Sequence, residues 1–202
     1  MAEKRKDLEE RRKILRDFLA TGIEEWPKVT HLIVFVKDRD GNVIYHEYYD
    51  SGGAHAESNM LSDNEFLKIV KKTRNVNITL TSNYSPCSNC ASELHKFYDD
   101  HRDFIKSFII KFSFIYYLDK PANRDGLKLL SKAGITLEAM TDESWFEVFM
   151  WSVFGFNNAD KVDKVRKRDS DTRKALSKLL HDVPEAGQRA SATEDRENEN
   201  NT

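Results

Sequence analysis

Apolar residues are spaced along this chain in two ways, and the alternation of the two spacings predicts a layered α/β fold. Short runs rich in β-branched and aromatic residues predict strands at 31–36, 43–49, 76–80, within 104–117 and at 135–140. Segments with apolar residues every three or four positions predict helices at 3–20, 56–72, 86–98, 124–132, 142–154 and 161–180. Asp40-Gly41 is a hairpin signal between the first two strands. Because strands and helices then alternate, we expect a mixed sheet with helices on both faces.

The same pattern divides the chain into three parts. Residues 1–24 hold a charged helix and its lead-in, 25–183 hold the alternating elements, and 184–202 contain almost no large apolar residue. A segment as polar as 184–202 buries too little apolar surface to fold, so we expect it to be disordered. The basic triplets Lys4-Arg5-Lys6 and Arg11-Arg12-Lys13 are interleaved with acids. We interpret them as a solvated helix face, with a nuclear signal or a phosphate-binding patch as the alternative.

Composition and charge say more about the cellular compartment of the protein than about the reaction it performs. The 202 residues are 39% hydrophobic and 33% charged, with a net charge of −2. No apolar run reaches the roughly 20 residues of a membrane span, and residues 1–10 lack the apolar core of a secretory signal. Only two cysteines are present, so no disulfide framework is expected. We therefore expect an intracellular protein, cytoplasmic or nuclear, in which any basic surface for nucleic acid is local.

Two short motifs carry the chemistry. His55-Ala56-Glu57 is followed by Pro86-Cys87-Ser88-Asn89-Cys90, and together they form the H-x-E and P-C-x-x-C signature of zinc-dependent deaminases. One imidazole and two thiolates can hold a zinc ion and leave a fourth position for water, whose pKa zinc lowers to about 7. The sequence thus predicts one Zn²⁺ per chain held by His55, Cys87 and Cys90. Glu57, which is not a ligand, would carry protons between the water, the ring nitrogen and the leaving ammonia.

The alternative is a structural zinc site, or two unrelated buried thiols. A structural site usually has four protein ligands, and no fourth ligand is paired locally with these three. The remaining histidines are scattered along the chain, and we expect each to be a surface or core residue: His31, His46, His95, His101 and His181. This favours an open site of the catalytic type.

Further motifs give the chain a resemblance to the AID/APOBEC polynucleotide cytidine deaminases, from Lys28 to Phe154. The family's Ser-Trp-Ser-Pro-Cys-x-x-Cys is matched by Asn83-Tyr84-Ser85-Pro86-Cys87-Ser88-Asn89-Cys90. Its Tyr-rich strand end followed by Asp is matched at 115–119, and its Gly-Leu-x-x-Leu-x-x-Ala-Gly segment at 126–134. A hydrophobic strand ending in Met follows, here at Met140. The sequence lies far from the vertebrate members and resembles a divergent, invertebrate-type relative.

This resemblance implies a cytidine-deaminase-like three-layer α/β fold, with a five-stranded mixed sheet and about six helices. It implies conversion of cytosine to uracil in single-stranded DNA, with RNA as the alternative partner. It also implies substrate contacts from five residues: Thr30, Ala56, Tyr84, Ser85 and Tyr116. Tyr84 would line the base pocket, and Tyr116 would stack on the target cytosine. The loop that begins with Leu118, Asp119 and Lys120 would read the base 5′ of the target.

Departures from the family pattern keep other functions open. Asn83-Tyr84 replaces Ser-Trp, and Asp50 with two glycines precedes His55, where an acidic group would repel phosphate. The alternatives are a deaminase of free cytidine, deoxycytidine or a nucleotide, and a catalytically silent, zinc-stabilised nucleic-acid-binding protein. We expect a monomer or a weak oligomer.

Several aromatic residues of the chain also have a purely structural interpretation. One of Tyr116 and Tyr117 is expected in the core, Trp26 over the sheet edge, and Trp145 and Trp151 in packing roles.

Overall fold

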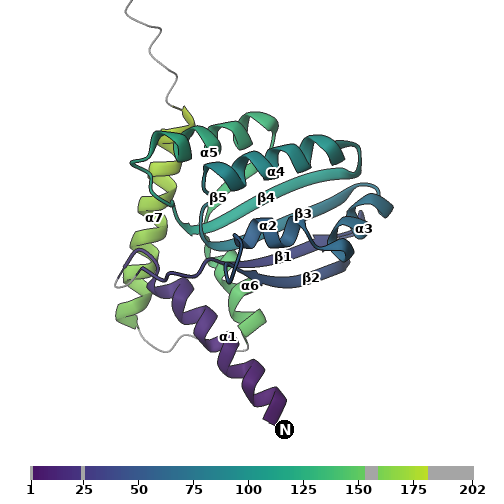
Figure 1. Cartoon of the computed structure of the whole chain (residues 1–202). Coiled ribbons are helices and arrows are strands. Elements are labelled where there is room, and N and C mark those ends of the chain that lie inside the picture. Colours follow the sequence, from purple (N-terminus) through teal and green to yellow (C-terminus); the bar gives the residue numbers. More distant parts are fainter. Residues whose placement is uncertain (1, 24–25, 153–158, 182–202) are drawn as a thin grey trace, which may run out of the picture.

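The computed structural model describes the backbone of residues 2–23, 26–152 and 159–181, and the side chains of 9–23, 26–148 and 161–181. Its centre is one sheet of five strands in the order β2-β1-β3-β4-β5 (Figure 1). The strands are β1 His31–Lys37, β2 Val43–Asp50, β3 Val76–Tyr84, β4 Ile105–Phe114 and β5 Thr136–Ala139. The β1 strand pairs antiparallel with β2 and β3, whereas β3, β4 and β5 are parallel. The predicted mixed sheet is therefore confirmed.

Helices cover both faces of this sheet (Figure 1). They are α1 Ala2–Ala20, α2 Ala56–Leu61, α3 Asn64–Lys72, α4 Ser88–His101, α5 Pro121–Ala133, α6 Asp142–Ser152 and α7 Ala159–His181. One apolar cluster joins the sheet to α2, α3, α4 and α5, and a second joins it to α1 and α6. Helix α7 contributes Leu176 and Leu179 to the first cluster and Val165 to the second. The result is the expected three-layer α/β fold.

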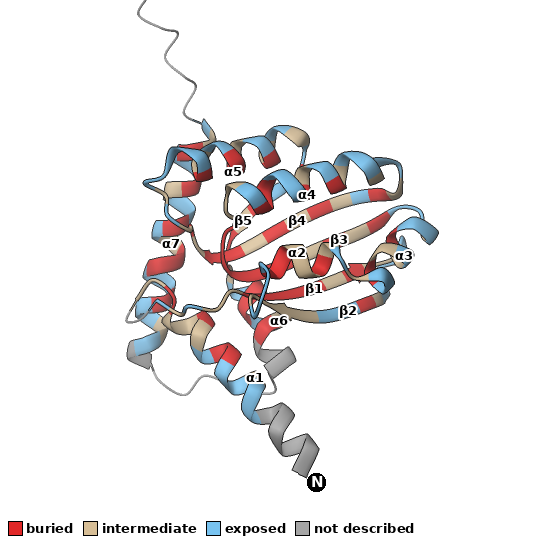
Figure 2. Ribbon diagram, viewed as in Figure 1, coloured by how far each residue is buried: buried red, intermediate tan, exposed pale blue. Residues whose placement is uncertain are grey.

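The two clusters follow from the alternation of side chains along a strand. In β1, Leu32, Val34 and Val36 belong to the first cluster, and Ile33 belongs to the second. Buried residues accordingly run along the strands and on the helix sides that face them (Figure 2). A strand buried on both faces reads as a continuous apolar run, which is why residues 31–36 lack alternation in the sequence.

Several element boundaries differ from the sequence prediction. The single helix predicted at 56–72 is wrong, because a first helix ends at Leu61 and Asp63 is the N-cap of a second one, which brings the α-helices in the described part to seven. The Asp63 carboxylate caps α3 by accepting the backbone N–H groups of Glu65 and Phe66, and it accepts the Tyr49 hydroxyl at 2.7 Å. Strand β3 reaches Tyr84, four residues beyond the prediction, and α5 begins at Pro121.

Some expectations fall outside the described residues. They are the disorder of 184–202, the end of the helix predicted at 142–154, and the packing of Trp151. The side chains of Lys4, Arg5 and Lys6 are likewise not described. Within the described part of the chain, none of the helices has the length and apolar character needed to cross a membrane.

Candidate metal centre and the adjoining cavity

The three expected zinc ligands lie at the starts of two helices. His55 is the N-cap of α2, Cys87 is the N-cap of α4, and Cys90 lies in the first turn of α4. The sheet topology brings them together, because β2 and β3 both run antiparallel to β1 and so end at the same edge. The sequence prediction placed Pro86 and both cysteines within one helix. That detail is wrong, since Cys87 has extended backbone angles (φ −73, ψ 172) and α4 begins at Ser88.

The ligand atoms converge on one point. The Nδ1 atom of His55 lies 3.2 Å from the Cys90 sulfur and 3.5 Å from the Cys87 sulfur. All three ligand atoms lie within 4.8 Å of one another. Among the described residues, no fourth His, Cys, Asp or Glu joins this group. One imidazole and two sulfurs are a donor set that zinc prefers, and three protein ligands are the number found in open, catalytic sites. The residues present therefore fit a zinc ion.

The protonation of the centre suits a cation. A hydrogen bond from Cys90 lowers the pKa of the Cys87 thiol to about 5, and that same hydrogen bond raises the pKa of Cys90. The pair thus releases one proton readily, and a bound cation would displace the other. Burial raises the pKa of Glu57, whose side chain is 4% exposed and lies beside Cys90. A buried carboxyl whose pKa is raised holds a proton more readily than a free one, which suits general acid–base work.

A cavity of about 690 Å³ is lined in part by Tyr84 and Tyr116, and Tyr116 lies close enough to Cys87 for the two groups to interact electrostatically. Its wall is largely aromatic: Trp26, Tyr84, Phe114, Tyr116 and Tyr117. The Trp26 and Tyr84 rings are parallel within 9°, with centroids 6.4 Å apart. Tyr116 meets both Tyr84 and Tyr117 edge to face, at 5.6 Å and 4.5 Å. Faces of this kind can stack with flat, aromatic ligands.

The predicted substrate residues divide into those that line the cavity and those that lie behind it. Lining it are Thr30, Tyr84, Tyr116, Leu118 and Asp119. The Lys120 ammonium lies 4.2 Å from the centroid of the Tyr117 ring. Ser85 and Ala56 are buried, and the Ser85 hydroxyl accepts the backbone N–H of Tyr116 at 3.0 Å. Their roles in substrate contact stay predictions.

One structural expectation about these aromatics is wrong. Neither Tyr116 nor Tyr117 is buried, because Ile115 takes the core position at the end of β4. Trp26 packs against Tyr84 and Phe114, the last residues of β3 and β4, and is 64% exposed at the cavity. The expectation that Trp145 packs in the core is confirmed, since only 6% of it is exposed.

Two buried asparagines near the site were given no role from the sequence. Asn83 accepts the His31 N–H at 2.8 Å and donates to the Val29 carbonyl at 3.1 Å, which fixes the chain segment leading from the cavity into β1. Asn123 contacts the start of α4 and the turn after β4. The one local signal for Asn123 was its place two residues after Pro121 near a helix start, where amide side chains often bind backbone groups.

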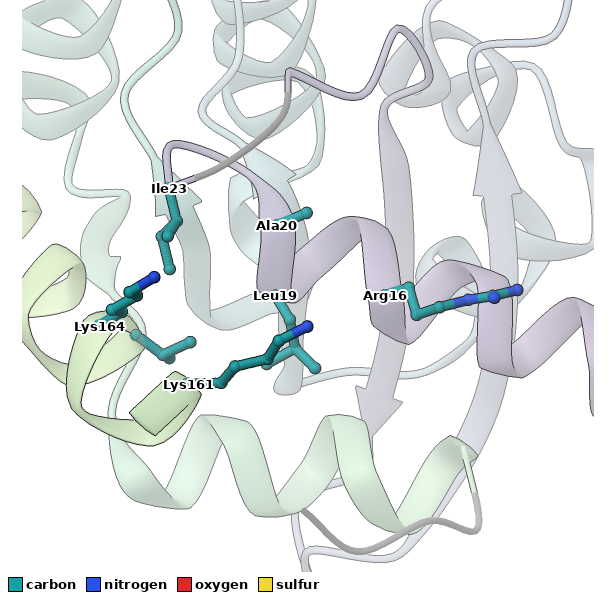
Figure 3. Close-up of a pocket in the computed structure, with 7 residues that line it drawn as sticks. Arg16, Leu19, Ala20, Ile23, Lys161 and Lys164 are labelled. Atoms are coloured by element: carbon teal, nitrogen blue, oxygen red, sulfur yellow. The ribbon is translucent and has the colours of Figure 1, made fainter. Parts of the chain in front are cut away.

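A smaller cavity of about 190 Å³ lies between α1 and α7 (Figure 3). Leu19, Ala20, Ile23 and Val165 give it an apolar lining, and Arg16, Lys161 and Lys164 rim it. The Arg16 side chain extends away from the two lysines (Figure 3). The three cationic groups therefore do not converge on one point as they would in an anion site.

Comparison with known protein families gives one match relevant to this site. Residues 14–190 match the family described as invertebrate AID/APOBEC deaminase. The matched region contains the three ligands, Glu57 and the whole wall of the larger cavity.

Proposed function

Because the chain belongs to the invertebrate AID/APOBEC deaminase family, we propose that it is a zinc-dependent enzyme that deaminates cytosine to uracil in single-stranded DNA. The observation that carries the proposal is the convergence of His55, Cys87 and Cys90 beside the buried carboxyl of Glu57. This arrangement supplies metal ligands and a proton carrier in one place. The reaction consumes one water molecule and releases ammonia.

The residues divide the chemistry among them. His55, Cys87 and Cys90 would hold zinc, which when bound supplies the Lewis acidity that makes water reactive at neutral pH. Glu57 would take one proton from the attacking water and deliver it to the ring nitrogen, and would then carry the second proton of that water to the amino group, which departs as ammonia. Burial raises the pKa of Glu57, which keeps the protonated form accessible for the second of these transfers.

The cavity supports a polynucleotide substrate over a free nucleoside. Trp26 and Tyr117 are exposed by 64% and 50%, and both lie on its wall. Stacking of a base on an aromatic side chain contributes about 1–3 kcal/mol and tolerates any base. A free nucleoside has one base, whereas a strand also offers neighbouring bases to these exposed rings. Lys28, which lines the cavity, and Lys120, beside Tyr117, place positive charge where phosphates would pass.

The test is uracil release from a cytosine-containing DNA oligonucleotide, compared between the parent and Glu57→Gln. The variant keeps the size of the side chain and removes its proton transfer, so we expect activity to fall by about 10²–10⁴-fold. Zinc content should stay at one ion per chain in both proteins, because Glu57 is not a ligand.

Parallel assays separate the alternatives. Equal activity of Glu57→Gln and parent would refute the mechanism. Preferred turnover of RNA, cytidine or deoxycytidine monophosphate would move the proposal to that substrate. Normal oligonucleotide binding with zinc but without turnover of any of these would identify a catalytically silent binding protein.

A further inference from the structure

We propose that Asn123 is a positioning residue that fixes the Tyr116–Tyr117 wall of the cavity to the helix start that carries the cysteines. Its Oδ1 atom accepts the backbone N–H of Ser88 at 3.0 Å. Its Nδ2 atom donates to the carbonyl oxygens of Tyr116 and Tyr117 at 3.0 and 3.4 Å. Asn123 is only 5% exposed, so water does not compete freely for these bonds.

The bond to Ser88 satisfies a backbone group that the N-cap of α4 does not reach. The first N–H groups of a helix have no partner within the helix, and an N-cap side chain accepts only that of the second or third helical residue. Ser88 is the first residue of α4, directly after the N-cap Cys87. Asn123 from α5 accepts the Ser88 N–H and thereby fixes the helix start beside the Cys87 sulfur.

The bonds to the carbonyls hold a turn that is unfavourable by itself. Tyr117 has a φ of +42, in the left-handed region that residues other than glycine rarely adopt. Its carbonyl also accepts the Lys120 N–H at 3.0 Å. On the other side of the turn, the Tyr116 N–H donates to the Ser85 hydroxyl. Surrounding bonds are needed to maintain such a conformation, and Asn123 supplies two of them.

Close packing of α4 on α5 fixes where the Asn123 side chain lies. A Cβ atom at Gly126 would come within 2.9 Å of the Ala91 Cβ and 3.2 Å of the Ser88 Cα, so the two helices approach closely here. Asn123 lies three residues before Gly126, on the same part of α5. The Asn123 carboxamide therefore links two helices that cannot easily shift. Through its bonds to the Tyr116 and Tyr117 carbonyls it holds the turn in a fixed place relative to these helices.

The substitution Asn123→Asp separates the two ends of this link. A carboxylate still accepts the Ser88 N–H, but it cannot donate to the Tyr116 and Tyr117 carbonyls. We expect amide hydrogen exchange at 115–120 to become about tenfold faster, as for the loss of one hydrogen bond, with unchanged exchange at 88–91. The matched control is Asn89→Asp, which adds the same charge at an exposed position in the first turn of α4, the helix that Asn123 contacts.

Activity gives a second readout, and this part rests on the proposed function. The apparent KM for a DNA oligonucleotide should rise about tenfold in Asn123→Asp, with kcat and zinc content close to those of Asn89→Asp. A kcat loss with unchanged KM would instead indicate a disturbed metal centre and would overturn the proposal.

The amide hydrogen exchange measurement tests the role of Asn123 without any substrate. Its result therefore does not depend on whether the proposed deaminase activity is found. Exchange at 115–120 that matches the control would overturn the proposed role of Asn123. Should Asn123→Asp not fold, Asn123→Ala is expected to accelerate exchange in both 88–91 and 115–120. Acceleration in only the first segment would also count against the link.

Discussion

His31 lies between two partners from different elements, and its environment predicts how stability depends on pH. Its Nε2 atom is 2.7 Å from the Asp17 carboxylate, and its Nδ1 atom is 2.7 Å from the Tyr48 hydroxyl. Because a carboxylate only accepts, Nε2 carries the proton and Nδ1 accepts from Tyr48. Burial lowers the pKa of His31 below 6.5, and this outweighs the opposite influence of Asp17.

The sign of the pH effect follows from proton binding. Below about pH 6.5 the unfolded chain takes up a proton at His31 before the folded protein does. The free energy of unfolding should therefore decrease as the pH falls below 6.5, by at most about 1.4 kcal/mol per pH unit from this group. His31→Gln removes this contribution, so its stability deficit relative to the parent should shrink between pH 7.5 and 5.5. Urea unfolding at both pH values measures the difference.

His46, whose pKa is also lowered by burial, keeps its own contribution in both proteins. The control is Leu129→Gln, at an exposed position without an ionisable group, and it should retain the parent's pH dependence. A deficit of His31→Gln that stays constant with pH would contradict the prediction.

Individual site residues could be predicted from the sequence only where they lie in short motifs. Two contiguous motifs contain the proposed ligands and proton carrier, and both can be recognised without a structure: His55, Glu57, Cys87 and Cys90. Asn123 acts through Ser88, 35 positions away, and Asn83 acts through His31, 52 positions away. Hydrogen-bond partners this far apart in the sequence are brought together by the order of the strands in the sheet. They therefore produce no pattern in the sequence around either residue.

Among the helices, Arg168 of α7 joins α1 to the rest of the molecule. Its Nη1 atom donates to the carbonyls of Phe18 and Thr21 at the end of α1, at 3.0 and 2.8 Å. Its Nε and Nη2 atoms donate to Asp169, which in turn accepts the Trp145 indole N–H at 2.6 Å. One buried guanidinium thus contacts backbone or side chains belonging to three helices.

Removing this guanidinium should strongly destabilise the fold. Arg168→Ala leaves the Asp169 charge and two helix-end carbonyls without their partner, so we expect a loss of about 3–5 kcal/mol in the free energy of unfolding. Arg166→Ala is the control on the same helix, because Arg166 is 65% exposed and 4.0 Å from Asp142. Its effect should stay within about 0.5 kcal/mol. Similar urea midpoints for the two variants would show that the buried contacts contribute little.

Element types were predictable because periodicity is local, whereas breaks and buried charges were not. Residues 56–72 keep a helical spacing of apolar side chains, yet Asp63 interrupts them through a contact with Tyr49 of β2. Helix α7 is rich in charged residues, yet Arg168, Asp169 and Thr172 are buried. In both cases a tertiary contact overrides the sequence pattern.

For the whole molecule, the mixed character of the sheet followed from the sequence, but its strand order did not. Alternating strands and helices imply parallel neighbours, and the hairpin implies an antiparallel one. The order β2-β1-β3-β4-β5 puts β3 and β4 side by side, which places Tyr84 next to the turn that bears Tyr116. The cavity beside the metal centre is therefore a product of topology, and no single segment encodes it.

The overall charge predicts how the proposed binding to single-stranded DNA depends on salt. The chain has a net charge of −2, and the cations beside the cavity are Lys28 on its wall and Lys120 over Tyr117, with Asp119 opposing them. Each phosphate contact on a single strand contributes about −0.7 to the slope of log K against log salt. We therefore expect a slope near −1.4, with most of the affinity coming from stacking on the aromatic wall.

Two substitutions in the inactive Glu57→Gln background separate charge from stacking. Lys120→Ala should make the slope shallower by about 0.7, whereas Trp26→Ala should weaken binding about 5- to 100-fold at every salt concentration and leave the slope unchanged. Fluorescence anisotropy of a labelled oligonucleotide between 50 and 200 mM salt measures both effects. The slope that about two phosphate contacts produce is large enough to be measured over that range. A slope of about −4 or steeper would mean that the strand is held by basic surface away from the cavity. In that case the aromatic wall would be secondary, and Trp26→Ala would cost little.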